Sequence, residues 1–193
     1  MSVQDSTFPE AWKHSFIMPI FKAGNRGDIA NYRGVCIQNS LAKLFNSLVC
    51  GQLTWQRKGI ISEKQSGFSS GKSTTSSLVQ YECDLLGALE RGVQTVAVYT
   101  DFSKAFDRVN FGLLLDKLES AGFHDSLLKW LKSFLIGRTR SVKVHGCTSA
   151  PTNVVSGVPQ GSHCAPLLFN LFVNDIVNVI NHSSVSMFAV SGQ

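Results

Sequence analysis

Features that mark several specialised protein classes are missing from this chain of 193 residues. Its five cysteines are odd in number and include no C-x-x-C pair, which argues against a zinc site and against a disulfide framework. No apolar run reaches the roughly 18 residues of a membrane span, and the N-terminal segment lacks the basic start and apolar core of a signal peptide. We therefore expect an intracellular protein, in the cytoplasm or the nucleus, with no membrane partner.

Low-complexity tracts, internal repeats and Pro- or Ser-rich linkers are also absent, so the length fits a single domain. Apolar residues make up 44% and charged residues 16%, a composition that permits a buried core and excludes a disordered chain. The net charge of +5 suits an anionic partner. One stretch carries five basic residues and no acidic residue, and its members are Lys129, Lys132, Arg138, Arg140 and Lys143.

The apolar pattern predicts a mixture of strands and helices. Residues 16–21 and 33–37 are short apolar runs around a turn and predict a hairpin. Helical spacing predicts helices capped by Ser40 and Ser73. Further along we expect a strand over 93–99, helices over 113–121 and 125–135, paired strands over 141–145 and 153–156, a buried helix over 164–180 and a final strand over 185–190. This order indicates an α+β protein with helices packed on a small sheet.

Two acidic residues follow the strand expected over 93–99, in the segment TDFSKAFDRVN. Asp101 stands at the predicted strand end and Asp107 six residues later, a pattern compatible with a Mg²⁺ ligand and a structural partner. The alternative is that Asp101 caps the next turn and Asp107 pairs with Lys104 or Arg108. Residue types alone favour the second interpretation.

Two other segments carry candidate binding residues. In SGVPQGSHCAPLLFN, glycines around Gln160 allow backbone to approach a ligand closely, although an ordinary turn before a helix has the same composition. Lys22 and Arg33 flank the hairpin turn, where they suit phosphate or are simply solvated. The segment 67–74 has three residues between its glycines, whereas a P-loop needs four, so we expect a capped helix there.

Taken in order, these segments resemble the reverse transcriptase domain of non-LTR (LINE-type, Jockey-like) retrotransposons, over residues 12–189. PIFKAGN with NYRGV resembles the family's fingers hairpin, and QSGFSSGKST resembles the next fingers element. YTDFSKAFDRV and SGVPQGSHCAPLLFNLFVND resemble two successive palm motifs. The resemblance implies a right-hand polymerase fold with a fingers region over 1–92 and a partial palm over 93–193, in which a small antiparallel sheet packs on helices and the thumb is absent.

The resemblance also implies roles for individual residues. Asp101 would be catalytic and would bind Mg²⁺, and Asp107 would have a structural role. The incoming dNTP would contact five residues: Lys22, Arg33, Phe106, Gln160 and Gly161. Of these, Phe106 would pack against the sugar. The basic stretch 129–143 would contact the backbones of an RNA template and a DNA primer, each phosphate contact adding salt dependence.

The sequence departs from the family where a second strand should end in Phe/Tyr-Ala-Asp-Asp. Here Val190 and Ser191 stand at the places of both aspartates, and neither supplies a carboxylate to a metal. Transfer of a dNTP to a primer 3′-hydroxyl in this family uses two metal ions, so we expect this truncated chain to be inactive. The alternatives are a non-catalytic remnant that binds nucleic acid and a poorly stable product without function.

Overall fold

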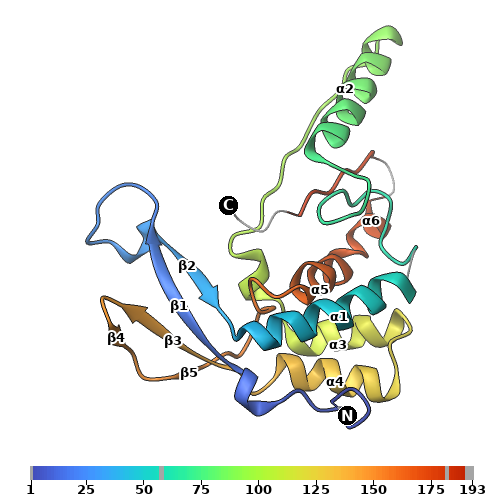
Figure 1. Ribbon diagram of the computed structural model, residues 1–193. Coiled ribbons are helices and arrows are strands. Elements are labelled where there is room, and N and C mark those ends of the chain that lie inside the picture. The colour runs from blue at the N-terminus through green and yellow to red at the C-terminus, as the bar shows by residue number, and fades with distance from the viewer. Residues whose placement is uncertain (1, 57–58, 181–182, 190–193) are drawn as a thin grey trace.

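The computed structural model of the chain describes residues 2–56, 59–180 and 183–189. They form an α+β fold in which a small sheet lies beside a group of helices, while one long helix projects from the body (Figure 1). Within these ranges no helix is both long and apolar enough to cross a membrane. The elements, in chain order, are η1 (Glu10–Trp12), β1 (His14–Phe21), η2 (Ile29–Asn31), β2 (Tyr32–Ile37), α1 (Ser40–Gln56), α2 (Thr74–Glu90), η3 (Ala105–Arg108), α3 (Phe111–Ser120), α4 (Asp125–Leu135), β3 (Thr139–Val144), β4 (Cys147–Thr148), β5 (Thr152–Asn153), α5 (Cys164–Val173) and α6 (Ile176–Val179).

The sheet has the strand order β2-β1-β3-β4, and β5 pairs with the other end of β3. Strands β1 and β2 are antiparallel, with Phe21 opposite Tyr32, which confirms the predicted hairpin. Strands β1 and β3 run parallel, so the sheet is mixed rather than purely antiparallel. The strand predicted over 153–156 lies earlier, at β5, where Asn153 pairs with Thr139.

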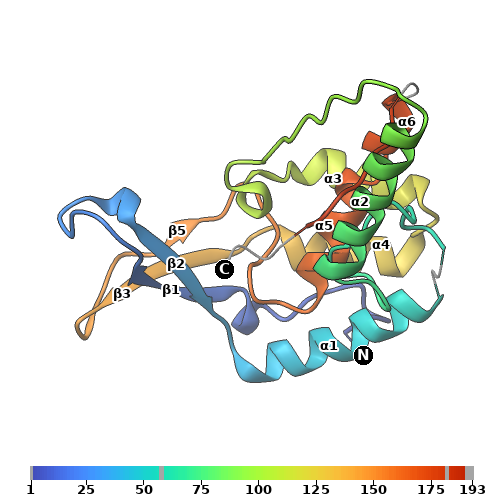
Figure 2. The ribbon, with the colours of Figure 1, turned by 90° about the horizontal axis from the view of Figure 1, so that it is seen from above.

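The main core lies among α1, α3, α4 and α5 (Figure 2). Apolar residues at helical spacing on α3 and α4 face inward, so Leu114, Leu118 and Trp130 are fully buried. The Trp130 ring stacks on Phe134 at 5.7 Å between ring centroids, and Phe8 packs edge-on against both. This core spans both halves of the chain, because α1 and α5 pack against each other.

The two predicted helix caps have different outcomes. Ser73 caps α2 as expected, since its hydroxyl accepts a hydrogen bond from the Ser76 amide. In turn, the Ser76 hydroxyl accepts one from the Ser73 amide. The prediction that Ser40 caps the helix α1 was wrong. The side-chain oxygen of Asn39 accepts from the amides of Leu41 and Ala42 at 2.9 and 3.4 Å, and Ser40 is the first residue of α1.

The structure corrects two predicted strands. Residues 93–99 contain no strand, and Val96 and Val98 are about four-fifths exposed, at 78% and 81%. A β-rich run becomes a strand only with a hydrogen-bonded neighbour, and the described residues provide none for it. Residues 185–189 form a single bridge, between Met187 and Gln65, and residue 190 lies outside the described ranges.

The predicted long helix over 164–180 is interrupted after Val173. The side chain of Asn174 donates to the Ile60 carbonyl and accepts from the Ser62 amide, both across the molecule. Asp175 forms an ion pair with Lys117 at 2.6 Å. The two hydrogen bonds of Asn174 hold the 60–62 segment at the point where α5 ends and α6 follows.

Candidate nucleotide and template site

The loop 156–161 is hydrogen-bonded to the short helix η3 and the residue after it. The Val158 amide donates to the Phe106 carbonyl and the Gly157 amide to the Val109 carbonyl, both at 2.8 Å. The Ser156 hydroxyl donates to the Asp107 carbonyl at the same distance. Two segments separated by about fifty residues in the sequence, and picked out by separate motifs, therefore form one unit.

Glycine at position 157 is required for this close approach. Its φ is +92°, a conformation that residues with a Cβ rarely adopt. A Cβ at this position would lie 2.8 Å from the Asp107 Cα and from the Phe106 carbonyl oxygen. Both obstacles are backbone atoms, so they cannot move aside as a flexible side chain would.

The Phe106 ring is held between two other aromatic rings. It stacks on Phe169 of α5 at 4.6 Å between ring centroids, and Phe68 lies edge-on at 6.3 Å. Only 8% of the residue is exposed. The orientation of the Phe106 ring is therefore fixed by its aromatic neighbours.

Gln160 and Gly161 touch the base of the β1–β2 hairpin. The buried side-chain amide of Gln38, just after β2, donates to the Gln160 carbonyl at 3.2 Å. A Cβ on Gly161 would come within 3.5 Å of the Cys36 carbonyl. The Gln160 loop is thereby connected to η3 on one side and to the hairpin on the other. Sequence reasoning did not identify Gln38.

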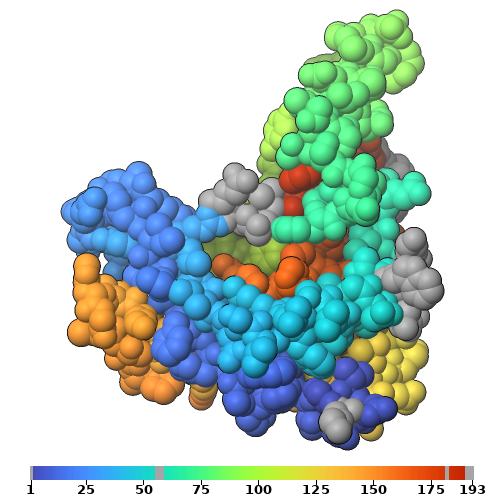
Figure 3. All heavy atoms as spheres, in the orientation of Figure 1, coloured from blue at the N-terminus to red at the C-terminus, as the bar shows by residue number. Residues whose placement is uncertain are grey.

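Lys22 and Arg33 share one face of the hairpin. Arg33 lies directly opposite Ile20, and residues opposite each other project to the same face. Lys22 follows Ile20 by two residues, which returns it to that face at the end of the strand. Lys22 is exposed and Arg33 half-buried. Figure 3 shows the surface hollowed between the hairpin and the segment after α1, with the beginning of α5 at its floor.

Asp101 lies on a second concave surface next to this region. It lines a cavity of about 490 Å³ together with residues of the 102–108 segment and with Phe169, Phe172 and Val173 of α5. Asp101 is exposed and does not end a strand, contrary to the sequence-based expectation. In the described ranges neither Asp101 nor Asp107 forms an ion pair with Lys104 or Arg108.

Comparison with known proteins identifies the family. Residues 20–189 match the family model described as reverse transcriptase (RNA-dependent DNA polymerase). The chain belongs to this family. It is 33% identical over 190 residues to a probable RNA-directed DNA polymerase from transposon X-element of Drosophila melanogaster, covering 94% of the chain and 21% of that protein. It is 34% identical over 172 residues to the RNA-directed DNA polymerase from mobile element jockey of the same species, covering 88% of the chain and 19% of that protein.

This reverse transcriptase chain spans about a fifth of the length of these curated relatives. Among solved structures it is similar to apo telomerase from Candida tropicalis truncated from the C-terminal domain, with a TM-score of 0.56 and 15% identity. The match covers 90% of this chain and 40% of the telomerase chain. At that identity the likeness supports the fold alone. Together the matches confirm the α+β polymerase fold and the LINE-type family.

The carboxylates that the structure describes in this reverse transcriptase chain do not assemble a Mg²⁺ centre. Within residues 2–56, 59–180 and 183–189, no group of three or more acidic, histidine or cysteine residues is placed to hold a metal ion. Asp101 is the one carboxylate among the described site residues at the cavity near η3. Val190 and Ser191 lie outside the described residues, and neither side chain carries the negatively charged carboxylate oxygens that Mg²⁺ prefers.

The basic stretch does not form one surface. Arg138 is only 4% exposed, and its guanidinium lies 5.3 Å from the Phe134 ring centroid and donates to the Phe134 carbonyl. Burial lowers the pKa of this guanidinium. The predicted contact of Arg138 with nucleic acid stays a prediction, and the burial of this side chain does not favour it. A buried arginine is not distinguishable from an exposed one by its sequence neighbours.

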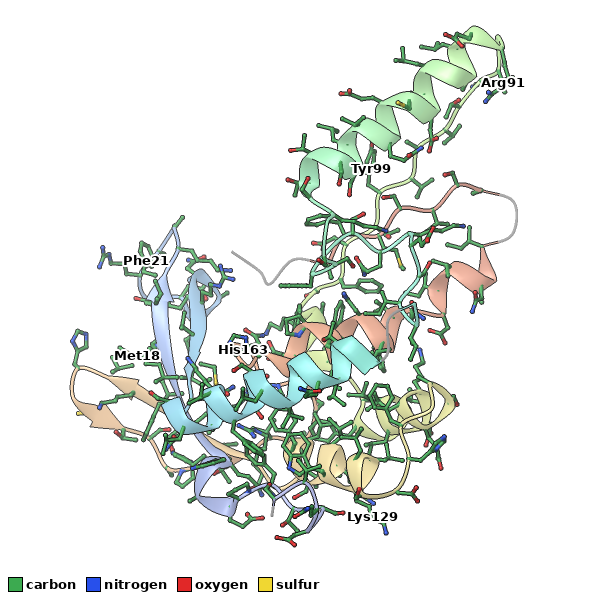
Figure 4. The ribbon with its side chains drawn as sticks, turned by 45° about the vertical axis from the view of Figure 1, so that its right-hand side comes forward. Met18, Phe21, Arg91, Tyr99, Lys129 and His163 are labelled. Atoms are coloured by element: carbon green, nitrogen blue, oxygen red, sulfur yellow. The ribbon has the colours of Figure 1, made fainter. Side chains whose placement is uncertain are left out.

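The four other basic residues are exposed, but they separate into two pairs. Lys129 and Lys132 lie on α4, and Figure 4 shows Lys129 far from Met18 and Phe21 of the hairpin. Arg140 and Lys143 lie on β3, beside β1, and the Lys143 ammonium is 5.8 Å from the Phe16 ring centroid. The β3 pair is thus on the sheet that carries Lys22 and Arg33.

Proposed function

We propose that this chain is the fingers region, over 1–92, and a partial palm, over 93–193, of a LINE-type RNA-directed DNA polymerase. We propose further that it binds dNTP and template–primer without transferring the nucleotide. The observation that carries the proposal is the connection of the Gln160 loop to both the hairpin and η3, through Gln38 and Phe106. Three segments that the resemblance assigns to nucleotide binding are joined by these hydrogen bonds. The names of the Drosophila relatives supply the reaction class.

Two cations on one face of the hairpin support binding of the triphosphate. Arg33 offers a planar fork of donors for phosphate oxygens, and Lys22 acts as a point charge beyond it. Lys22 is exposed, and Arg33, opposite Ile20 of β1, is half-buried outside the core, so the triphosphate does not have to displace packed side chains. Phe106 would pack against the sugar, while Gln160 and Gly161 would face the base and the template.

The proposed absence of nucleotide transfer follows from the small number of carboxylates that the site offers to metal ions. Neutralising the charge that develops during phosphoryl transfer needs carboxylates that hold metal ions on both sides of the phosphate. Asp101 supplies one carboxylate, and the sequence places valine and serine where the others would be. Loss of metal stabilisation worth several kcal/mol lowers the rate by orders of magnitude, since about 1.4 kcal/mol is tenfold.

A second candidate function is a module that binds nucleic acid but not dNTP. The exposed cations of β3, Arg140 and Lys143, favour this alternative because they require no nucleotide pocket. Both candidates predict salt-dependent binding of a primer–template. Only the first predicts that a dNTP complementary to the next template base binds to that complex.

The test combines binding and extension on the purified chain. We expect a fluorescent dNTP to bind to the chain–primer–template complex. Binding should weaken by about ten- to a hundredfold in Lys22→Ala and in Arg33→Ala, as expected for a charged hydrogen bond of about 1.5–3 kcal/mol. Arg91→Ala, which removes the same charge at the far end of α2, is the control and should bind normally (Figure 4).

Extension is measured in the same samples with Mg²⁺ and all four dNTPs. We expect no added nucleotide. Primer extension that Asp101→Asn abolishes would overturn the proposed inactivity, because it would mean that a working metal centre forms. Binding of primer–template without any binding of dNTP would favour the second candidate function.

A further inference from the structure

Two cysteines connect the helix after the hairpin to the helix after the Gln160 loop. We propose that Cys50 of α1 and Cys164 of α5 are a redox modification site, which forms a reversible disulfide when the protein meets a peroxide. The proposal goes beyond nucleotide binding and does not depend on it. It rests on the placement of the two thiols relative to each other and to the backbone between them.

Each sulfur lies against the backbone next to the other cysteine. The Cys50 thiol donates to the carbonyl of His163, the residue before Cys164, at 3.2 Å. The Cys164 thiol donates to the carbonyl of Asn46, one helical turn before Cys50, at 3.5 Å. The helices α1 and α5 that carry them pack side by side (Figures 1 and 2).

This placement meets the main requirement for a disulfide. Two cysteines can be bridged without backbone movement only when their Cβ atoms are close and point toward each other. The two thiol-to-carbonyl contacts place each sulfur beside the stretch of backbone that carries the other cysteine, which is the arrangement that this condition needs. Because both sit on helices in the core contact between the two halves of the chain, their separation is fixed by packing rather than by a loop.

The two thiols have different environments, which assigns a role to each. Cys50 is half-buried, and the hydrogen bond from Cys164 lowers its pKa to about 7 against the opposing effect of burial. Cys164 is fully buried, and its pKa is raised by the hydrogen bond to Cys50 and by desolvation. Cys50 is therefore the thiolate that reacts first, and Cys164 is the thiol that resolves the product.

The chemistry is a two-electron oxidation of the thiol pair by hydrogen peroxide. The Cys50 thiolate attacks one peroxide oxygen, the O–O bond breaks, and the departing hydroxide takes a proton to become water. The sulfenic acid formed on Cys50 then reacts with the Cys164 thiol, forming the S–S bond and releasing a second water. A small thiol reverses the reaction by thiol–disulfide exchange.

The other three cysteines serve as internal comparisons. Cys83 on α2 and Cys147 on β4 are exposed, on elements at opposite ends of the molecule (Figure 1). Cys36 is half-buried on β2, where it accepts a hydrogen bond from Gln38 at 3.9 Å. Among these three, the described structure places no thiol against another cysteine. An intramolecular disulfide elsewhere in the chain is not expected.

The test uses the full chain with Cys36, Cys83 and Cys147 replaced by serine, which leaves only the proposed pair. After treatment with hydrogen peroxide, free thiols are alkylated and the protein is digested without reductant for mass spectrometry. We expect a cross-linked peptide pair that has lost two hydrogen atoms and separates on reduction. The oxidised chain should also unfold at a higher temperature than the same sample after reduction, because the cross-link restricts the unfolded chain.

Two single variants test the assigned roles. In Cys164→Ser, oxidation should stop at a sulfenic acid on Cys50 that a dimedone probe captures. In Cys50→Ser, Cys164 should stay unoxidised under the same conditions. The proposal is overturned if the triple variant yields a sulfenic or sulfinic acid on Cys50 with Cys164 still free, or only disulfides between chains. That mapping decides the matter even where a single variant fails to fold.

Discussion

The side-chain amide of Gln38 hydrogen-bonds to the backbone carbonyl of Gln160 at 3.2 Å, across more than a hundred residues of sequence. Gln38 is only 6% exposed and follows β2 directly, so its amide stands at the base of the hairpin. The Gln160 loop continues into α5, whose first turn contacts α1 through Cys164. One buried amide thus connects the hairpin to the loop that the nucleotide is proposed to meet.

Gln38→Ala should loosen this loop. The Gln160 carbonyl loses its donor, and a neutral hydrogen bond contributes about 1 kcal/mol to the free energy of unfolding. We expect chemical denaturation to report a loss of about that size, and hydrogen exchange to rise in residues 156–162. Gln52→Ala, an exposed glutamine on α1, is the matched control and should change neither measurement. Unchanged exchange in Gln38→Ala would mean that the hydrogen bond does not hold the loop.

Gly157→Ala should destabilise the protein more than another glycine substitution with a similar backbone angle. Gly71 has a φ of +77° and open space around it, so Gly71→Ala pays only the left-handed strain of about 1–2 kcal/mol. At Gly157 the new Cβ also meets backbone atoms at 2.8 Å, which adds about 1–3 kcal/mol. The difference between the two variants in urea denaturation measures the steric part. Equal losses would contradict the tight contact between the loop and η3.

Local sequence signals predicted the elements whose formation depends mainly on their own residues. The hairpin, the Ser73 cap and helices α3 and α4 have clear apolar periodicity or capping residues, and the structure confirms each. Residues 93–99 have equally strong β propensity but form no strand. Their state depends on whether another segment lies alongside, which composition does not specify.

The same division applies to the candidate site. Motifs identified Asp101, Phe106 and Gln160 as candidates, and the contacts around the last two are now visible, although their binding roles stay predictions. Gln38 carried no signal, because a glutamine after a strand is common and its burial results from the packing of distant segments. Arg138 was assigned to the surface by its basic neighbours, whereas its ring contacts come from Phe8 and Phe134 in the core.

Asn46→Leu should stabilise the protein. Neither side-chain polar atom of Asn46 has a hydrogen-bond partner in the part of the chain that the structure describes, and the residue is 1% exposed. An unsatisfied buried polar group costs about 1–3 kcal/mol, which an apolar side chain of similar size removes. We expect a higher denaturation midpoint at an unchanged slope. Asn46→Asp, which buries a charge at the same place, should lower the midpoint, and a stabilising effect of both would contradict this account.

Arg138→Ala and Arg140→Ala should affect different properties although they are two residues apart. Arg138 packs its guanidinium over Phe134 and Phe8, so its removal should lower the free energy of unfolding by about 1–3 kcal/mol through lost packing and a lost hydrogen bond. Arg140 is exposed on β3, and its removal should leave stability within about 0.5 kcal/mol.

Arg140→Ala should weaken nucleic-acid binding more than Arg138→Ala does, which is the reverse of their expected effects on stability. Titrating primer–template binding against salt, we expect Arg140→Ala to reduce the slope of log K against log salt by about one, since one phosphate contact is lost. Arg138→Ala should keep the slope of the unmodified chain wherever the variant is folded, because a buried guanidinium releases no counterion. A slope that falls in Arg138→Ala and not in Arg140→Ala would mean that the two side chains exchange places in the nucleic-acid complex, and the buried position of Arg138 would not describe the bound state.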